Sequence, residues 1–133
     1  MSGIVYDAGV LIAAERSDRA VWADHRVRLK QGTIPVIPAA VIAQVSRSPR
    51  QAQLRRLLRG CDIAELDEDT AHHVGRILAQ ACTSDVVDGA VVAAAVARSA
   101  AVLTSDRADI AISSSRPGLT YPFSTSDPGL FDV

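Results

Sequence analysis

Apolar residues occur along the chain in short continuous runs that alternate with longer segments of helical spacing. The short runs are rich in β-branched residues and predict four strands, at residues 3–6, 34–37, 63–66 and 101–104. The longer segments predict six helices, at residues 8–15, 19–30, 38–45, 49–59, 67–81 and 86–98. Strands that alternate with helices are typical of a parallel sheet covered on both faces.

The end of the chain has a different composition from the rest. From Ser113 onward it is rich in Ser, Pro and Gly, and residues 119–123 are the one stretch there that can form a last strand, after a short helix that follows Asp106. We expect a single domain over residues 1–133, with a loosely ordered tail from about residue 115. A chain of 133 residues is long enough for one core.

Composition narrows the class of protein. Hydrophobic residues make up 48 % of the chain and charged residues 22 %, which is too apolar for a disordered chain. The longest uncharged windows, such as residues 89–97, fall far below the roughly 20 apolar residues of a membrane span. The start of the chain shows no basic segment followed by an apolar one, so we expect a cytoplasmic protein without a membrane partner.

Cys61 and Cys82 have no metal-ligand spacing and are expected to be buried thiols.

Four acidic residues are placed where the predicted fold can bring them together. Asp7 and Asp106 each follow a predicted strand, and Asp85 and Asp88 lie one turn apart at the start of a predicted helix. The carboxyl ends of parallel strands share one edge of the sheet. Carboxylates about 5 Å apart repel by about 3 kcal/mol per pair at an effective dielectric near 20, so a divalent cation is the expected counter-charge. A set of oxygen ligands without His or Cys suits Mg²⁺ or Mn²⁺.

Each of these acids also has a structural explanation. Asp7, Asp85 and Asp106 can each act as the N-cap of the helix that follows it. Asp88 is the least easily explained in this way. The metal hypothesis therefore depends on all four acids lying at the same edge of the predicted sheet.

Taken in order, the motifs resemble those of PIN-domain ribonucleases, and more narrowly of VapC-type toxins. The match extends from Gly3 to about Ile112 and rests on the order and spacing of four segments: residues 5–7, 38–45, 85–90 and 102–106. The resemblance implies a three-layer α/β/α domain with a mostly parallel central sheet. It also implies RNA cleavage with Mg²⁺ or Mn²⁺ and a small VapB-type antitoxin that blocks the site. A homodimer is left open.

The resemblance also assigns roles to individual residues. Asp7, Asp88 and Asp106 take the family's acidic places as metal ligands, and Asp85 is an auxiliary acid that would orient the attacking water or act as a base. Gln44 stands where the usual pattern has Glu. Its amide oxygen can contact a metal-bound water but brings no charge, which weakens the affinity for a second ion.

The departure at Gln44 leaves an alternative open, a PIN-like module that binds RNA or a partner without efficient hydrolysis. Glu15 is the nearest acid that could substitute for the missing Glu, but it lies two turns along its helix from Asp7. Residues 25–61 contain no Asp or Glu and eight of the 14 basic residues. The Arg-rich part from Arg47 to Arg59 is either an RNA track or an ordinary solvated helix face.

Overall fold

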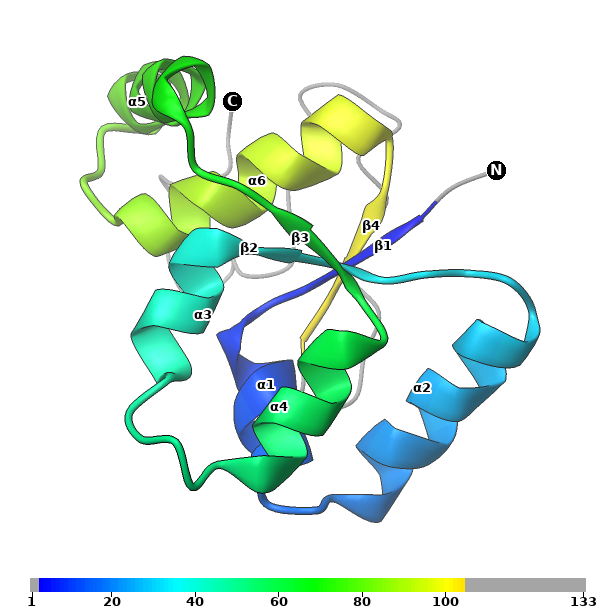
Figure 1. Ribbon diagram of the computed structural model, residues 1–133. Helices are drawn as coiled ribbons and strands as arrows, with labels where there is room; N and C mark the ends of the chain where they lie inside the picture. Colours follow the sequence, from blue (N-terminus) through cyan, green and yellow to red (C-terminus); the bar gives the residue numbers. More distant parts are fainter. Residues whose placement is uncertain (1–2, 105–133) are drawn as a thin grey trace.

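A four-stranded parallel sheet forms the centre of the computed structural model, which describes residues 3–104 (Figure 1). The strand order is β3-β2-β1-β4, with strands at Ile4–Tyr6 (β1), Val36–Pro38 (β2), Asp62–Ala64 (β3) and Ala101–Leu103 (β4). Tyr6 is aligned with Leu103 between the neighbouring strands β1 and β4, so these two strands end level with each other. The predicted α/β class and parallel sheet are therefore confirmed. The helix and strand predicted after Asp106 lie outside the described residues.

Six helices complete the described part of the chain. They are α1 (Ala8–Glu15), α2 (Arg19–Lys30), α3 (Ala39–Val45), α4 (Ala52–Arg59), α5 (Glu68–Ala81) and α6 (Val86–Arg98). α6 packs against β1, β2 and β4, with α5 behind it, while α1 contacts β1 and α4 contacts β3 from the other side (Figure 1). The result is a three-layer α/β/α arrangement. α3 follows the end of β2 and contacts both α1 and α6.

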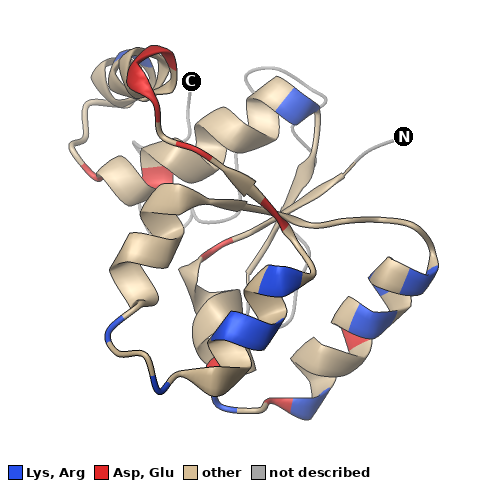
Figure 2. Cartoon of the chain, in the orientation of Figure 1, with Lys and Arg blue, Asp and Glu red and all other residues tan. Residues whose placement is uncertain are grey.

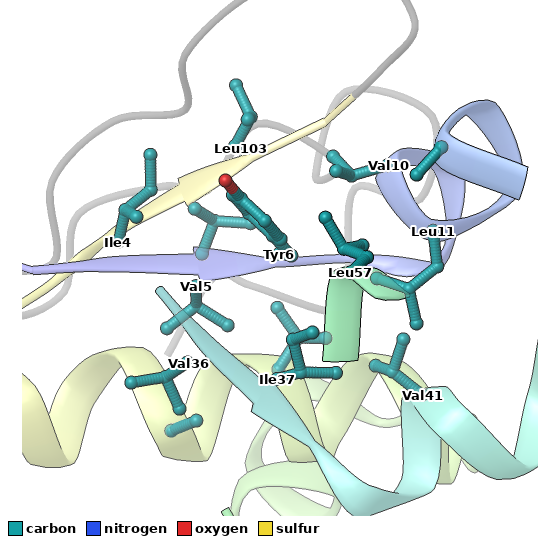
Figure 3. Packing of buried hydrophobic residues seen from close by; sticks show 14 of the residues in the cluster. Ile4, Val5, Tyr6, Val10, Leu11, Val36, Ile37, Val41, Leu57 and Leu103 are labelled. Carbon is teal, nitrogen blue, oxygen red and sulfur yellow. The ribbon is translucent and has the colours of Figure 1, made fainter. Parts of the chain in front are cut away.

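The central strand β1 is buried on both of its faces. In Figure 3, Ile4 and Tyr6 point away from α6 while Val5 points towards it, as the two-residue period of a strand requires. Val5 and Tyr6 have no exposed surface. Full burial of a residue of this size stabilises the fold by about 1.5–3 kcal/mol. The end of β1, and with it the position of Asp7, is thus fixed by packing on both sides.

The start of α4 is the clearest difference from the predicted elements. The pattern predicts a helix from residue 49, but α4 begins at Ala52. The side chain of Gln51 explains the delay, because its Oε1 accepts hydrogen bonds from the N–H groups of Arg47 (2.7 Å) and Ser48 (3.1 Å). Its Nε2 donates to the carbonyl of Val45 (3.0 Å). These bonds hold residues 46–51 as a compact turn instead of a helical one.

The cysteine prediction is wrong for one residue. Cys61 is half-buried, and burial raises the pKa of its thiol to about 12. Cys82 is exposed, because it ends α5 in the left-handed conformation with φ of 57° and lies in the connection to α6.

Within residues 3–104, no helix on its own has the length and apolar composition to span a membrane. α5 and α6 meet that test only as a pair, and their axes are bent by 108°.

Candidate functional site

Asp7 lies directly beyond the carboxyl end of β1. Its backbone N–H donates to the carbonyl of Leu103 (3.3 Å), which extends the β1–β4 pairing by one residue. Its carboxylate is the N-cap of α1, where Oδ1 accepts from the N–H of Val10 (3.2 Å). The side chain is half-buried. Asp7 therefore has the capping role that the sequence allowed, in a position that also faces the carboxyl edge of the sheet.

Asp85 and Asp88 form the first turn of α6. Asp85 is the N-cap, and its Oδ1 accepts a hydrogen bond from the N–H of Asp88 (3.0 Å). Asp85 is exposed, whereas Asp88 is half-buried. α6 runs from this turn back along the sheet to Arg98, just before the amino end of β4, so its first turn lies towards the carboxyl edge (Figure 1). Ala8, next to Asp7, and Val87, next to Asp88, are both partly buried residues that pack against the main hydrophobic core.

Gln44 occupies the second-last position of α3 and is exposed. Its helix contacts both α1, which follows Asp7, and α6, which carries Asp88. The first turns of α3 and α6 are close as well, since Ala40 packs in the same small cluster as Ala90. The segments that carry Asp7, Gln44 and Asp88 thus meet towards the carboxyl ends of the strands, where α3 contacts both α1 and α6.

Asp106 lies outside the described residues. Within residues 3–104, no group of three His, Cys, Asp or Glu side chains is placed to hold a metal ion. Asp7, Asp85 and Asp88 therefore do not make a complete metal site by themselves. The donors that are present are carboxylate oxygens, the ligand type that Mg²⁺ and Mn²⁺ prefer.

Glu15 is already used elsewhere in the fold. Its Oε1 accepts a hydrogen bond from the backbone N–H of Leu54 (2.8 Å), in the first turn of α4. Gln51, the N-cap residue of α4, makes no side-chain cap hydrogen bond to its own helix. The bond from Leu54 to Glu15 therefore gives the start of α4 a side-chain acceptor that its own N-cap residue does not supply. Glu15 therefore does not replace the carboxylate that is missing at Gln44.

Gly89 sets how closely α5 approaches the acidic turn of α6. A Cβ atom at this position would lie 2.8 Å from Cδ2 of Leu78 and 3.0 Å from Cγ1 of Val74, both on α5. Such contacts are shorter than real Cβ atoms make, so any side chain there would force Leu78 and Val74 to shift. The glycine next to Asp88 is thus explained by helix packing, which also fixes the orientation of the first turn of α6.

A buried polar network beside β1 was missed by sequence reasoning. Arg28 Nη1 donates to Tyr6 Oη (3.0 Å), and Tyr6 Oη also shares a hydrogen bond with His25 Nδ1 (2.8 Å). Burial raises the pKa of Tyr6 to about 12. Burial, with added repulsion from Arg28 and Arg26, lowers the pKa of His25. The spacing of Trp22, His25 and Leu29 on one helical stripe was the available signal.

A pocket of about 90 Å³ lies between α3, α5, α6 and the end of β3. Most of its lining consists of small apolar residues, among them Ala40, Ala64 and Ala93. None of the candidate site residues within the described part of the chain lines it. The acidic edge is therefore a separate feature from this pocket.

The fold defines the class as a three-layer α/β/α domain with a parallel central sheet. No protein-family model and no curated protein matches the sequence. Among solved structures, the chain is similar to one in the crystal structure of VapBC2 from Rickettsia felis bound to a DNA fragment from their promoter. The TM-score is 0.57 at 16 % identity, over 76 % of this chain and 85 % of that one. This likeness supports the PIN-like fold.

Proposed function

We propose that this protein is a metal-dependent RNA endonuclease, the toxin of a toxin–antitoxin pair located in the cytoplasm. The observation that carries the proposal is the hydrogen bond from the N–H of Asp7 to Leu103. Asp106 follows Leu103 by three residues, a stretch that spans at most about 11 Å when fully extended. The first turn of α6 with Asp88 lies at the same edge. Three carboxylates can therefore gather there.

In this mechanism Asp7, Asp88 and Asp106 would hold Mg²⁺ or Mn²⁺. The bound ion would polarise the scissile phosphate and lower the pKa of a water. Asp85 Oδ1 is engaged by the N–H of Asp88, which leaves its exposed second oxygen to orient that water or accept its proton. Gln44 can offer only an amide oxygen, so a second ion would be held more weakly.

The test is cleavage of RNA in Mg²⁺ and in Mn²⁺ by the wild type and by Asp7→Asn. Asn is a suitable replacement because its side-chain oxygen still caps α1, while it removes the charge. Asp24→Asn is the matched control, since Asp24 is an exposed acid on α2. We expect Asp7→Asn to lose cleavage activity and the control Asp24→Asn to cleave as the wild type does. Metal-dependent cleavage that survives Asp7→Asn would contradict the proposal.

The alternative is a PIN-like module that binds RNA or a partner without efficient hydrolysis, and the observation that favours it is Gln44. The substitution Gln44→Glu separates the two functions. For an active enzyme we expect cleavage by the wild type and faster cleavage by Gln44→Glu at low metal concentration. A wild type that binds RNA but does not cleave it in Mn²⁺ would favour the binding module.

An antitoxin partner is part of the proposal. The similar structure is of a complex named VapBC2, which supports a search for a small partner of this chain. Co-expression with any small reading frame found next to this gene, followed by purification, is the direct experiment. We expect a stable complex in which RNA cleavage is inhibited. Mass measurement of the free chain would show whether it forms a homodimer.

A further inference from the structure

One face of the molecule carries four exposed cations on two neighbouring helices. They are Arg26 and Lys30 on α2 and Arg55 and Arg59 on α4, which we call the α2–α4 basic face. Figure 2 shows the concentration of basic residues on these two helices. Within residues 3–104 the one ion pair closer than 4.0 Å joins His72 and Glu68 on α5. None of the four cations is therefore paired with a described carboxylate.

Contacts between side chains hold α2 and α4 side by side. The guanidinium of Arg56 stacks over the ring of Trp22, 4.5 Å from its centroid. At the ends of the helices, a Cβ atom on Gly60 would lie 3.6 Å from both His25 and Leu29. These contacts place the two helices, and the cations that they carry, next to each other.

Helix stabilisation explains only part of this arrangement. Lys30 and Arg59 lie in the last turns of their helices, where a cation is favoured by the helix dipole. Arg26 and Arg55 lie earlier and have no such explanation. Two exposed acids lie near these cations in the sequence. They are Asp24 on α2 and Asp62, which begins β3 shortly after α4 ends. The cations on the face still outnumber these acids.

The α2–α4 basic face is set apart from the acidic edge. Lys30 and Arg59 come shortly before β2 and β3, so they lie towards the amino ends of the strands. Asp7 follows the carboxyl end of β1. The length of a three-residue strand alone, about 10 Å, separates these two levels of the sheet.

We infer that the α2–α4 basic face binds the phosphate backbone of the RNA substrate at a distance from the scissile bond, so that the preferred substrate is a long RNA. The inference rests on the proposed nuclease function. Phosphates need cations and no sequence-specific groups, and the face offers unpaired cations. An apolar partner surface is less well matched, because α4 has no exposed large apolar residue and α2 has two, Val27 and Leu29.

The first test measures RNA binding without catalysis. A single-stranded RNA is titrated into full-length Asp7→Asn protein without divalent ions, at several salt concentrations. Adding Arg55→Gln and Arg59→Gln should reduce the slope of log K against log salt by about 1.4, since each lost phosphate contact contributes about 0.7. Arg76→Gln with Arg98→Gln is the matched control on α5 and α6, with the same change in charge. Arg55→Lys with Arg59→Lys should retain the slope.

The second test compares substrates of different length in the active protein. With long RNA, Arg55→Gln/Arg59→Gln should raise KM and leave kcat unchanged, while cleavage of a dinucleotide should not respond. An unchanged salt slope, or the same loss in the Arg76/Arg98 control, would overturn the inference. Arg-dependent binding of polyglutamate without RNA binding would overturn it in favour of an acidic polypeptide. If no variant cleaves RNA but the salt slope still depends on Arg55 and Arg59, the nuclease proposal fails and the RNA-binding face stands.

Discussion

The carboxylate of Glu15, the last residue of α1, accepts a hydrogen bond from the backbone N–H of Leu54 across 39 positions of the sequence. One helix thus supplies the N-terminal acceptor of another, and the two also pack against each other. An acid that sequence reasoning considered for catalysis is therefore part of the scaffold.

Replacement of Glu15 should destabilise the fold without affecting the site. We expect Glu15→Ala to lower the free energy of unfolding by about 0.5–2 kcal/mol, the range measured for loss of an N-cap. Glu15→Gln keeps a side-chain acceptor and should cost less. Urea denaturation measures both, and Mn²⁺ titration of the folded variants should give the wild-type affinity. A selective loss of Mn²⁺ binding in Glu15→Gln would instead place this residue in the metal site.

Gly89 and Gly75 should respond in opposite ways to substitution by alanine. At Gly89 the added methyl would collide with Leu78, and overpacking of this kind costs about 1–3 kcal/mol. At Gly75, on α5, nothing lies within 4 Å of the new Cβ, so alanine should stabilise the helix by about 0.5–1 kcal/mol. Thermal or urea unfolding of both variants provides the comparison. If both substitutions changed the free energy of unfolding equally, the close approach of α5 to α6 would not explain the effect at Gly89.

His25 should make the stability of the protein depend on pH. Its pKa is lowered in the folded state, so the unfolded chain takes up a proton at a higher pH than the folded one. Stability is therefore complete above the ordinary histidine pKa of about 6.5 and falls as the pH drops below it, by at most about 1.4 kcal/mol per pH unit. Urea unfolding between pH 7.5 and about pH 5.5 measures the slope.

The controls for this prediction are His25→Gln and His72→Gln. His25→Gln should flatten the slope over this pH range, although it lowers the stability because Tyr6 loses its native partner. His72→Gln removes an exposed histidine instead of the buried one and serves as the comparison. A wild-type slope that persists in His25→Gln would assign the effect to other groups.

The metal proposal predicts a specific binding defect. Titration of Mn²⁺ into the wild type should show saturable binding, and Asp88→Asn should weaken it by removing a charged ligand. Asp69→Asn, an exposed acid in the first turn of α5, is the matched control and should bind as the wild type does. Equal affinity of the wild type and Asp88→Asn would remove Asp88 from the proposed site. Calorimetry gives a readout independent of cleavage.

Much of the fold could be predicted because its signals are local. The alternation of β-branched runs with helical segments predicted all four described strands and six helices, and Asp7 and Asp85 cap helices as expected. Boundaries were less accurate where a side chain intervened, as Gln51 does at the start of α4. The predicted strand at residues 34–37 is observed at Val36–Pro38.

The candidate site could be predicted only as far as topology determines it. Parallel strands place the residue after each of them at one edge, which is enough to locate Asp7. The role of Glu15 could not be predicted, because its partner Leu54 is distant in the sequence. The Tyr6–His25–Arg28 network was missed because histidine and arginine are ordinarily surface residues. The metal ligands themselves stay a prediction.

Trp22 is the chain's sole tryptophan, and it contacts two groups of different character. Arg56 lies over its ring, and the ring of His25 meets it edge-on with centroids 5.8 Å apart. Any ligand that draws Arg56 towards solution, or any proton that enters His25, changes the surroundings of this one indole. The intrinsic fluorescence of Trp22 can therefore report ligand binding at Arg56 on α4 and protonation of His25 on α2 without an added label.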